Sequence, residues 1–233
     1  MLKPINFKGR HFSPDIILMA VRWYLAYALS YRDIEELMLE RGISGDHSTI
    51  HRWVVKYDPQ LENVFRKKYK RKPGVSWRED ETYIKVKRKW YYLYRAVDKE
   101  GYTVDFILLE KRDKKAAIEF FLKSIGDGGL PEKVTIDKIG SNKAALDFIN
   151  LILYLGGFYE WMIEIRQIKY LNNIVEQDHR FVKKITKPMM GFKEVKAASA
   201  TLVGIELWRM LKKRQHVYAG NMSIFEQFYT LAA

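Results

Sequence analysis

The sequence predicts an α/β fold, in which an all-α helix-turn-helix domain precedes a mixed five-stranded sheet flanked by helices. Two observations favour this fold class. Apolar residues recur at helical spacing up to about residue 70, whereas from about residue 80 they alternate with a period of two. Between these regions lies the pair Pro73 and Gly74, which favours a turn or linker. We therefore expect an all-α domain with a basic linker over 1–74 and a second domain, including the C-terminal helix, over 75–233.

The composition points to a polyanionic partner. The 233 residues include 41 Lys and Arg against 28 Asp and Glu, and this net charge of +13 favours nucleic acid first and an anionic membrane surface second. The absence of cysteine excludes disulfide scaffolds, thiolate zinc sites and cysteine nucleophiles. Because the N-terminus lacks a signal-peptide core and no run reaches ~18 apolar residues, the sequence predicts a cytoplasmic protein with no membrane partner.

Three amphipathic helices are expected in the first domain. The first begins at Ser13 and Pro14, a hydroxyl cap followed by a proline at the first helical position. Its apolar stripe comprises Ile17, Ala20, Val21 and Tyr24. The second covers SYRDIEELMLERG, with Ser30 and Asp33 in capping-box spacing, and the third covers HSTIHRWVVKY after the short turn ISGD. Helices joined by such a Gly-containing turn are typical of a helix-turn-helix.

The third helix offers a candidate DNA-reading face. Its outward-facing residues are expected to be Ser48, Thr49, His51, Arg52 and Lys56. Small hydroxyls and long donors of this kind reach base edges and phosphates from a major groove. The basic segment RKKYKRKPGVS over 66–76 suits phosphate contact as well. The alternatives, a solvated face on a helical bundle and a solvated basic hinge, stay open.

The second domain has the element order of a ribonuclease-H-like sheet. Strands are expected at about 80–87, 89–97 and 102–109, joined by the turns KRK and DKEG as an antiparallel meander. There follow a helix at about 113–125, the strand KVTID, a helix at about 141–155, the strand IEIRQI, and helices from about 172 and 194. Three antiparallel strands followed by alternating helices and strands predict the mixed sheet.

The first strand of the second domain carries a carboxylate on its apolar side. Asp80 is in phase with the apolar alternate positions from 82 to 86, whereas Glu79 and Glu81 are in phase with the polar ones. A carboxylate that faces a core costs free energy unless a positive group neutralises it. The sequence therefore predicts a cationic partner for Asp80.

Two further acids are candidates to share a site with Asp80. Asp137 ends the strand VTID, at the carboxyl edge where ligands of open sheets gather, although a turn or cap role is the simpler alternative. Glu176 leads a basic stripe on the helix NIVEQDHRFVKKITK, where an ordinary pair with Arg180 is the alternative. Three converging carboxylates would repel one another, and Mg²⁺ would relieve that repulsion. Two such ions ~3.5–4 Å apart suit phosphodiester chemistry.

The chain resembles the DDE transposases of bacterial and archaeal insertion sequences, specifically insertion sequence family six, within the retroviral-integrase superfamily. The stretches that carry the resemblance include GRHFSPDIILMAVRWYL, WREDETYIKVK, RQIKYLNNIVEQDHRFVKK and GFKEVKAASATLVGIE. The resemblance implies a ribonuclease-H-like catalytic domain that depends on Mg²⁺, with Mn²⁺ as a substitute. It also implies recognition of terminal inverted repeats by the N-terminal helices, cleavage that frees 3′-hydroxyl ends, and attack of those ends on target DNA.

Matched residue by residue, the resemblance assigns the catalytic, metal-binding triad to Asp80, Asp137 and Glu176. It assigns a basic residue one helical period later to Lys183, with Lys184 beside it. Because two ends of double-stranded DNA must be cut and joined, we expect a homodimer or higher assembly, with contacts through the N-terminal and C-terminal helices. The sequence departs from the family pattern after Asp137: the interval to Glu176 is longer than the family's, and the stretch LILYLGGFYEWM is unusually apolar.

Two other functions stay open on the sequence alone. A DNA-binding protein that keeps the helix-turn-helix but performs no chemistry would bind transposon ends without joining them. A metal nuclease of the same fold would nick DNA but never join it.

Overall fold

The chain folds as two compact units. The computed structural model describes residues 5–7, 11–137, 140–168 and 173–232, except for the side chains of residues 173–176. One unit, the helical unit, comprises Met1–Arg71 and Val182–Ala233, and the other, the sheet unit, comprises Lys72–Phe181. In the described ranges, no helix combines the length and the apolar content that crossing a bilayer requires.

The sheet unit is built on the predicted mixed five-stranded sheet. β1 (Ser76–Val86), β2 (Lys89–Asp98) and β3 (Thr103–Leu109) form the antiparallel meander, and β4 (Lys133–Ile136) and β5 (Glu164–Gln167) extend the sheet in parallel with β1. The strand order is β3-β2-β1-β4-β5. This order confirms the predicted fold class. β1 begins at Ser76 rather than near residue 80, because its first half pairs with β2 on one side and β4 on the other.

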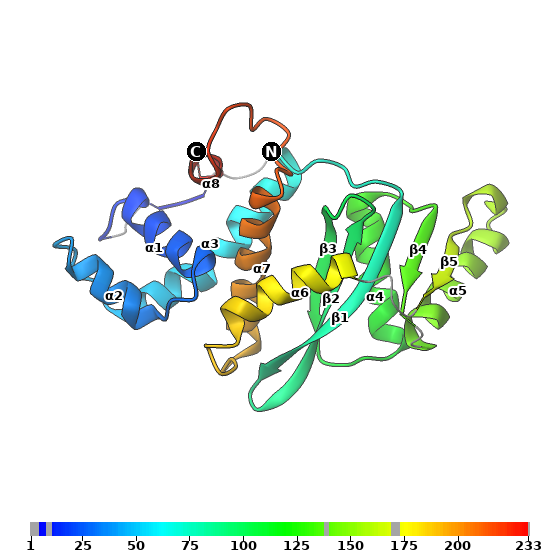
Figure 1. Ribbon diagram of the computed structural model, residues 1–233, viewed down its shortest axis with the longest axis horizontal. Helices are drawn as coiled ribbons and strands as arrows, with labels where there is room; N and C mark the ends of the chain where they lie inside the picture. Colours follow the sequence, from blue (N-terminus) through cyan, green and yellow to red (C-terminus); the bar gives the residue numbers. More distant parts are fainter. Residues whose placement is uncertain (1–4, 8–10, 138–139, 169–172, 233) are drawn as a thin grey trace. The chain divides into compact units, whose positions relative to one another are not determined.

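Helices cover both faces of this sheet. α4 (Lys114–Gly128) and α5 (Gly140–Leu155) lie on one face, and α6 (Asn173–Thr186) crosses the other (Figure 1). The core on the α4 side is formed by buried residues of the strands and of both covering helices, among them Trp77, Tyr94, Phe120, Val134 and Leu146. Because helices shield both faces, both phases of the first half of β1 are largely shielded from solvent.

The helical unit contains α1 (Pro14–Ala26), α2 (Tyr31–Leu39), α3 (His47–Lys68), α7 (Val195–Lys212) and α8 (Ile224–Thr230). The predicted apolar stripe of α1 is buried in full, and Ser30 and Asp33 form the predicted capping box of α2. α3 is longer than the sequence indicated. It continues through Pro59 to Lys68, so the first three residues of the basic segment, Arg66–Lys68, belong to the last helical turn.

The long C-terminal helix packs on α3. A Cβ at Gly204 of α7 would overlap the carboxylate of Asp58 of α3, so the two helices approach closely because residue 204 has no side chain. Asp58 is fully buried, and its burial raises its pKa well above the ordinary range. The sequence assigns this helix to the second domain, whereas its contacts place it in the helical unit. Sequence order alone does not reveal a helix that returns to pack on an earlier one.

Candidate active site and DNA-binding surface

Asp80 lies on β1, and Asp137 directly follows the adjacent parallel strand β4. The register of β1 and β4 pairs Ser76 with Lys133 and Arg78 with Thr135. Continuing this register past Thr135 brings Asp80 level with Asp137, which directly follows the end of β4. Thr135 is out of phase with the core residues of β4, so continuing the alternation puts Asp137 on the same sheet face as Asp80. The fold thus brings together two of the predicted acids.

The site disfavours negative charge on Asp80. The pKa of this carboxyl is raised from its ordinary 3.8 to about 6, chiefly by burial and also by the neighbouring charges of Glu81 and Asp137, against a lowering by the backbone N–H of Glu81. The side chain of Asp80 retains 21% exposure, enough for a ligand to reach it. An ionised Asp80 therefore requires a positive partner.

α6 supplies two residues to this face of the sheet. His179 is buried, and its Nδ1 lies 3.5 Å from Oδ2 of Asp80. Asp178 is 1% exposed, and its Oδ2 lies 3.7 Å from Nη2 of the fully buried Arg95. Arg95 is paired with Asp80 across β1 and β2. The sequence does not explain why an acid lies on the apolar side of this helix. The structure does, because Asp178 forms an ion pair with Arg95.

Glu176 occupies the first turns of α6, on the turn that precedes His179. The Glu176 side chain itself lies outside the described residues, and among the side chains that are described no group of three His, Asp or Glu forms a metal cluster. Lys183 and Lys184 are exposed on the second half of α6.

The donor set fits a divalent cation. Asp80 and Asp137 provide carboxylate oxygens, which Mg²⁺ prefers, and few protein ligands suffice because Mg²⁺ keeps several waters. The raised pKa of Asp80 agrees with this, because a cation would offset the burial and the like charges that favour a proton on that carboxyl. The acids present therefore suit a divalent metal.

A second polar cluster lies on the opposite face of β1. Glu79 is fully buried and Glu81 nearly so, and the expectation that both point to a polar side is wrong because α5 covers that face. Nδ2 of Asn142 donates to Oε2 of Glu79 at 2.6 Å and to Oε1 of Glu81 at 3.0 Å, and Nη2 of Arg112 donates to Oε2 of Glu81 at 2.9 Å. Burial raises the pKa of Glu79 well above its ordinary range, and the charge of Glu81 adds to this.

This cluster ties β1 to the start of α5, the helix that follows Asp137. Asn142 is the third residue of α5, so its two hydrogen bonds fix that helix against the strand that carries Asp80. Sequence reasoning missed Asn142 and Arg112. The predicted mixed sheet could have indicated such partners, because helices on both faces of a sheet bury both phases of a central strand, the acidic one included.

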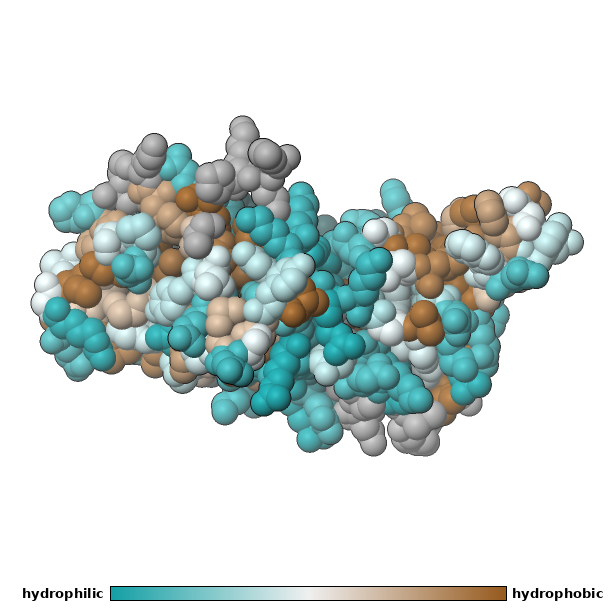
Figure 2. All heavy atoms as spheres, turned by 90° about the horizontal axis from the view of Figure 1, so that it is seen from above, coloured by the Kyte–Doolittle hydropathy of each residue, from teal (hydrophilic) through white to brown (hydrophobic). Residues whose placement is uncertain are grey.

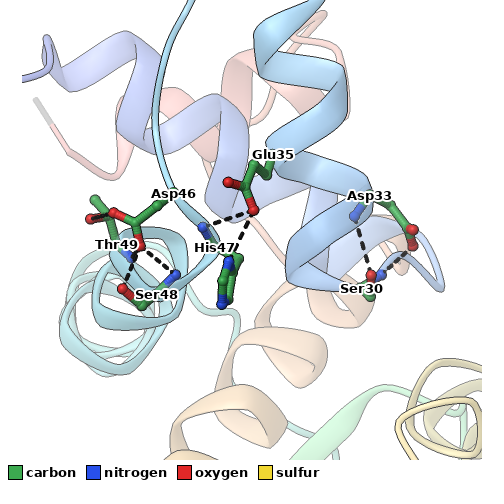
Figure 3. A network of polar contacts seen from close by, with 7 residues as sticks. All are labelled: Ser30, Asp33, Glu35, Asp46, His47, Ser48 and Thr49. Carbon is green, nitrogen blue, oxygen red and sulfur yellow. Dashed lines mark hydrogen bonds and ion pairs between the residues drawn. The ribbon is translucent and has the colours of Figure 1, made fainter.

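The predicted DNA-reading helix begins at a dense capping network (Figure 3). Asp46 caps α3: its carboxylate accepts from the backbone N–H groups of Ser48 and Thr49 and from both hydroxyls. These bonds, chiefly that with Ser48, lower the pKa of Asp46 below its ordinary range. Nδ1 of His47 lies 3.0 Å from Oε2 of Glu35, which links the first turn of α3 to α2.

Five residues of α3 were predicted to face outward, and the structure distinguishes them. Ser48 and Arg52 are exposed, whereas Thr49, His51 and Lys56 are half-buried. Nη2 of Arg52 donates to Oγ1 of Thr49 at 2.7 Å, so its guanidinium is held over the first turn of the helix. The ring of His51 contacts Tyr31 edge-on, and Nζ of Lys56 lies 4.8 Å from the ring centre of Tyr57.

Known proteins are similar to this chain. A family model described as a DDE domain matches residues 74–215. The "Transposase for insertion sequence-like element IS431mec" of Staphylococcus aureus (strain N315) is 42% identical over 210 residues, 90% of this chain and 90% of that protein. The "Transposase for insertion sequence element IS257 in transposon Tn4003" of Staphylococcus aureus has the same identity and coverage. The solved HTLV-2 integrase catalytic core domain in complex with magnesium is 19% identical, with a TM-score of 0.44 over 57% of this chain and 84% of that chain.

Proposed function

The chain belongs to the DDE-domain insertion-sequence transposases of the IS6 family, and on this premise we propose that it binds the terminal inverted repeats of its element and transfers their ends to target DNA. The observation that carries the proposal is that Asp137, just past β4, comes level with Asp80 of β1 when the register of these adjacent parallel strands is continued by two residues. A carboxylate just past the carboxyl end of β4, level with a second carboxylate on the adjacent strand, suits metal-assisted phosphodiester chemistry.

Asp80, Asp137 and Glu176 are the residues proposed to hold two Mg²⁺ ions, with Mn²⁺ as a substitute. When bound, two such ions activate the attacking oxygen and stabilise the leaving oxygen of a phosphodiester. The attacking group is water in the cleavage step and the freed 3′-hydroxyl in the joining step. Lys183 and Lys184 are proposed to contact DNA phosphates, since exposed lysines on a basic stripe suit that role.

The chain's other residues at the site hold the acids in place. His179 lies against Asp80, and Arg95 fixes the turn of α6 that carries Asp178. Because Glu176 lies within one turn of His179 and Asp178, these contacts would set where its backbone approaches the sheet. Two such sites, one for each transposon end, require at least two copies of the chain on DNA in the cytoplasm.

A strand-transfer assay tests the proposed function. Purified protein, a labelled duplex carrying the transposon end, and supercoiled target plasmid are incubated with Mg²⁺ or with EDTA, alongside Asp137→Asn. We expect joined product with Mg²⁺ only, and none from the variant. Nicking without joining would identify a nuclease of the same fold. End binding without either product would identify an inactive DNA-binding copy.

Arg52→Ala is expected to weaken binding of the transposon end by about 1–3 kcal/mol. If Arg52 contacts a phosphate, the slope of log K against the logarithm of the salt concentration should also become shallower by about one unit. The reason is that Arg52 is a long cation held exposed over the first turn of α3. Fluorescence anisotropy over a salt series measures both quantities. The control is Lys143→Ala, an exposed cation of α5 paired with Asp147. Equal affinities for Arg52→Ala and the control would remove Arg52 from the interface.

A further inference from the structure

Large apolar side chains gather at the end of α5 and in the turn after it. Eight of them are exposed, and together we define them as the aromatic surface: Leu151, Ile152, Tyr154, Leu155, Phe158, Tyr159, Trp161 and Met162. Figure 2 shows apolar side chains clustered at the right-hand end of the molecule, where α5 lies. Neither the proposed metal site nor the DNA-reading helix uses this surface.

The fold holds the aromatic surface in one shape. α5 ends in backbone hydrogen bonds from Gly156 to Ile152 and from Gly157 to Tyr154, and Gly157 adopts the left-handed φ of 79° that this ending requires. A Cβ at Gly156 would lie 2.9 Å from the ring of Phe158, so that ring packs directly on the glycine.

A side-chain clamp then closes the turn. Nδ2 of Asn150 donates to the carbonyl of Ile163 at 2.9 Å, and the Ile163 N–H donates to Oδ1 of Asn150 at 2.8 Å. The surface aromatics also contact each other, with the ring centres of Tyr154 and Tyr159 5.2 Å apart. A surface held in this way loses little conformational entropy on binding, which favours association.

The aromatic surface is nearly uncharged in a chain of net charge +13, and Glu160 is the only charged residue between positions 151 and 162. A polyanion such as DNA would therefore find little electrostatic attraction at this surface. Aromatic residues and methionine are enriched, and charged residues depleted, at the cores of protein–protein interfaces. Two copies of this chain can meet at the surface without bringing their basic residues together.

The exposed area is sufficient for a stable dimer. Aromatic side chains bury ~150–250 Å² each when fully covered. With four aromatic and four aliphatic or methionine side chains each exposed by 42–75%, the surface offers on the order of 800 Å². That is about what one partner contributes to a standard interface, and it exceeds the ~300–600 Å² of the largest apolar patch on a typical monomer.

A pocket adjoins the aromatic surface. Its volume is about 340 Å³, and it is lined by Leu130, Pro131, Glu132, Glu160, Trp161 and Met162. Trp161 and Met162 thus belong to both features. In a two-fold interface each copy contributes the same patch, so a protruding aromatic of one copy can enter the pocket of the other. The neighbouring edge strand β5 carries Glu164 and Arg166, charges that oppose strand-to-strand pairing.

We propose that the aromatic surface is the two-fold interface through which a second copy of this chain docks, by side-chain packing of α5 and the turn that follows it. The proposal deepens the assembly of at least two copies proposed above. It rests on the sheet unit alone, and its test needs neither DNA nor metal, so its failure would leave the proposed catalysis untouched.

Sedimentation of the full chain without DNA tests the proposal against a matched variant. Leu155→Glu places a charge at the end of α5, where the side chain is 75% exposed, and Leu39→Glu places the same charge at the end of α2, where it is 66% exposed. We expect wild type and Leu39→Glu to be dimers at micromolar concentration, and Leu155→Glu to dissociate with a Kd at least ~100-fold higher, because a buried unpaired charge is costly. Matching far-UV circular dichroism spectra of the two variants would show that folding is intact, whereas their melting temperatures should differ because dimerisation itself stabilises the native state.

Site-specific cross-linking locates the contact. Because the chain has no cysteine, Tyr159→Cys introduces the only thiol. We expect a flexible bismaleimide to give a cross-linked dimer of Tyr159→Cys but not of Leu39→Cys, because such a reagent joins thiols that are too far apart for a disulfide. A monomeric wild type, or a dimer that Leu155→Glu leaves intact, would overturn the proposal. A monomer that co-sediments with phosphatidylcholine vesicles would overturn it as well, and would assign the surface to lipid.

Discussion

Asp80→Asn is expected to lower cleavage and strand transfer at least ~10³-fold while raising the stability of the metal-free protein at pH 7.5. The loss of activity follows from removing a metal ligand, since metal ions contribute several kcal/mol of transition-state stabilisation and each ~1.4 kcal/mol is tenfold in rate. The gain in stability follows from burial, because Asp80 is charged at pH 7.5 in an environment that raises its pKa to about 6. Asparagine fits the same space without the charge.

The contribution of Asp80 to folding stability depends on pH with a defined sign. The folded-state pKa of Asp80 lies above its ordinary value of 3.8. Between about pH 4 and pH 6 the native state therefore holds more of this proton than the unfolded chain does, and the contribution of Asp80 to stability falls as pH rises through that window. In wild type, Mg²⁺ should restore stability at pH 7.5, where the carboxylate is free to bind it, and much less at pH 5, where protons compete.

Urea unfolding at pH 5 and pH 7.5, with and without Mg²⁺, measures these effects. The matched control is Asp147→Asn, which removes an exposed carboxylate of the same unit and should change neither the activity nor the response to Mg²⁺. An Asp80→Asn protein that is still stabilised by Mg²⁺ at pH 7.5 would show that the ion binds elsewhere. An unchanged reaction rate would remove Asp80 from the site.

The order of the elements was predictable because it follows from periodicity. The change from helical spacing to alternation, with turn signals between the strands, gives the strands and helices of the sheet unit and most of their boundaries. The phase of β1 was also predictable: Asp80 does share its face with the apolar alternate positions. The position of Asp80 in the candidate site follows from that phase.

The buried polar contacts could not be predicted, because they depend on which helices and strands pack against each other. Glu79 alternates like a solvent-facing residue, yet α5 buries it, and only the position of Asn142 in three dimensions accounts for that. Asp178 likewise has no explanation until Arg95, which is distant in the sequence, is seen opposite it. The periodicity of a sequence describes one helix or strand at a time, whereas the two partners of a buried polar contact come from two different elements.

Arg95→Met is expected to lower the free energy of unfolding by about 3–5 kcal/mol. Arg95 is fully buried, and its guanidinium lies 3.7 Å from the carboxylate of Asp178, which is itself buried. Methionine fills a similar volume but removes the cation that faces this carboxylate in a low-dielectric environment, and the loss of that ion pair is the main cost. Urea unfolding at pH 7.5 measures the change.

A double-mutant cycle separates the cost of breaking the ion pair from the net value of the pair. Arg95→Met with Asp178→Leu should recover most of the lost stability, because replacing a buried ion pair by apolar residues is often neutral, whereas breaking it is not. The same cycle on the exposed pair Lys143 and Asp147 should give less than about 1 kcal/mol. If the double variant were as unstable as Arg95→Met, the cost would come from lost packing around Arg95 instead. Recovery of stability without recovery of strand transfer would show that the pair is needed to position α6, and with it Glu176, over the sheet.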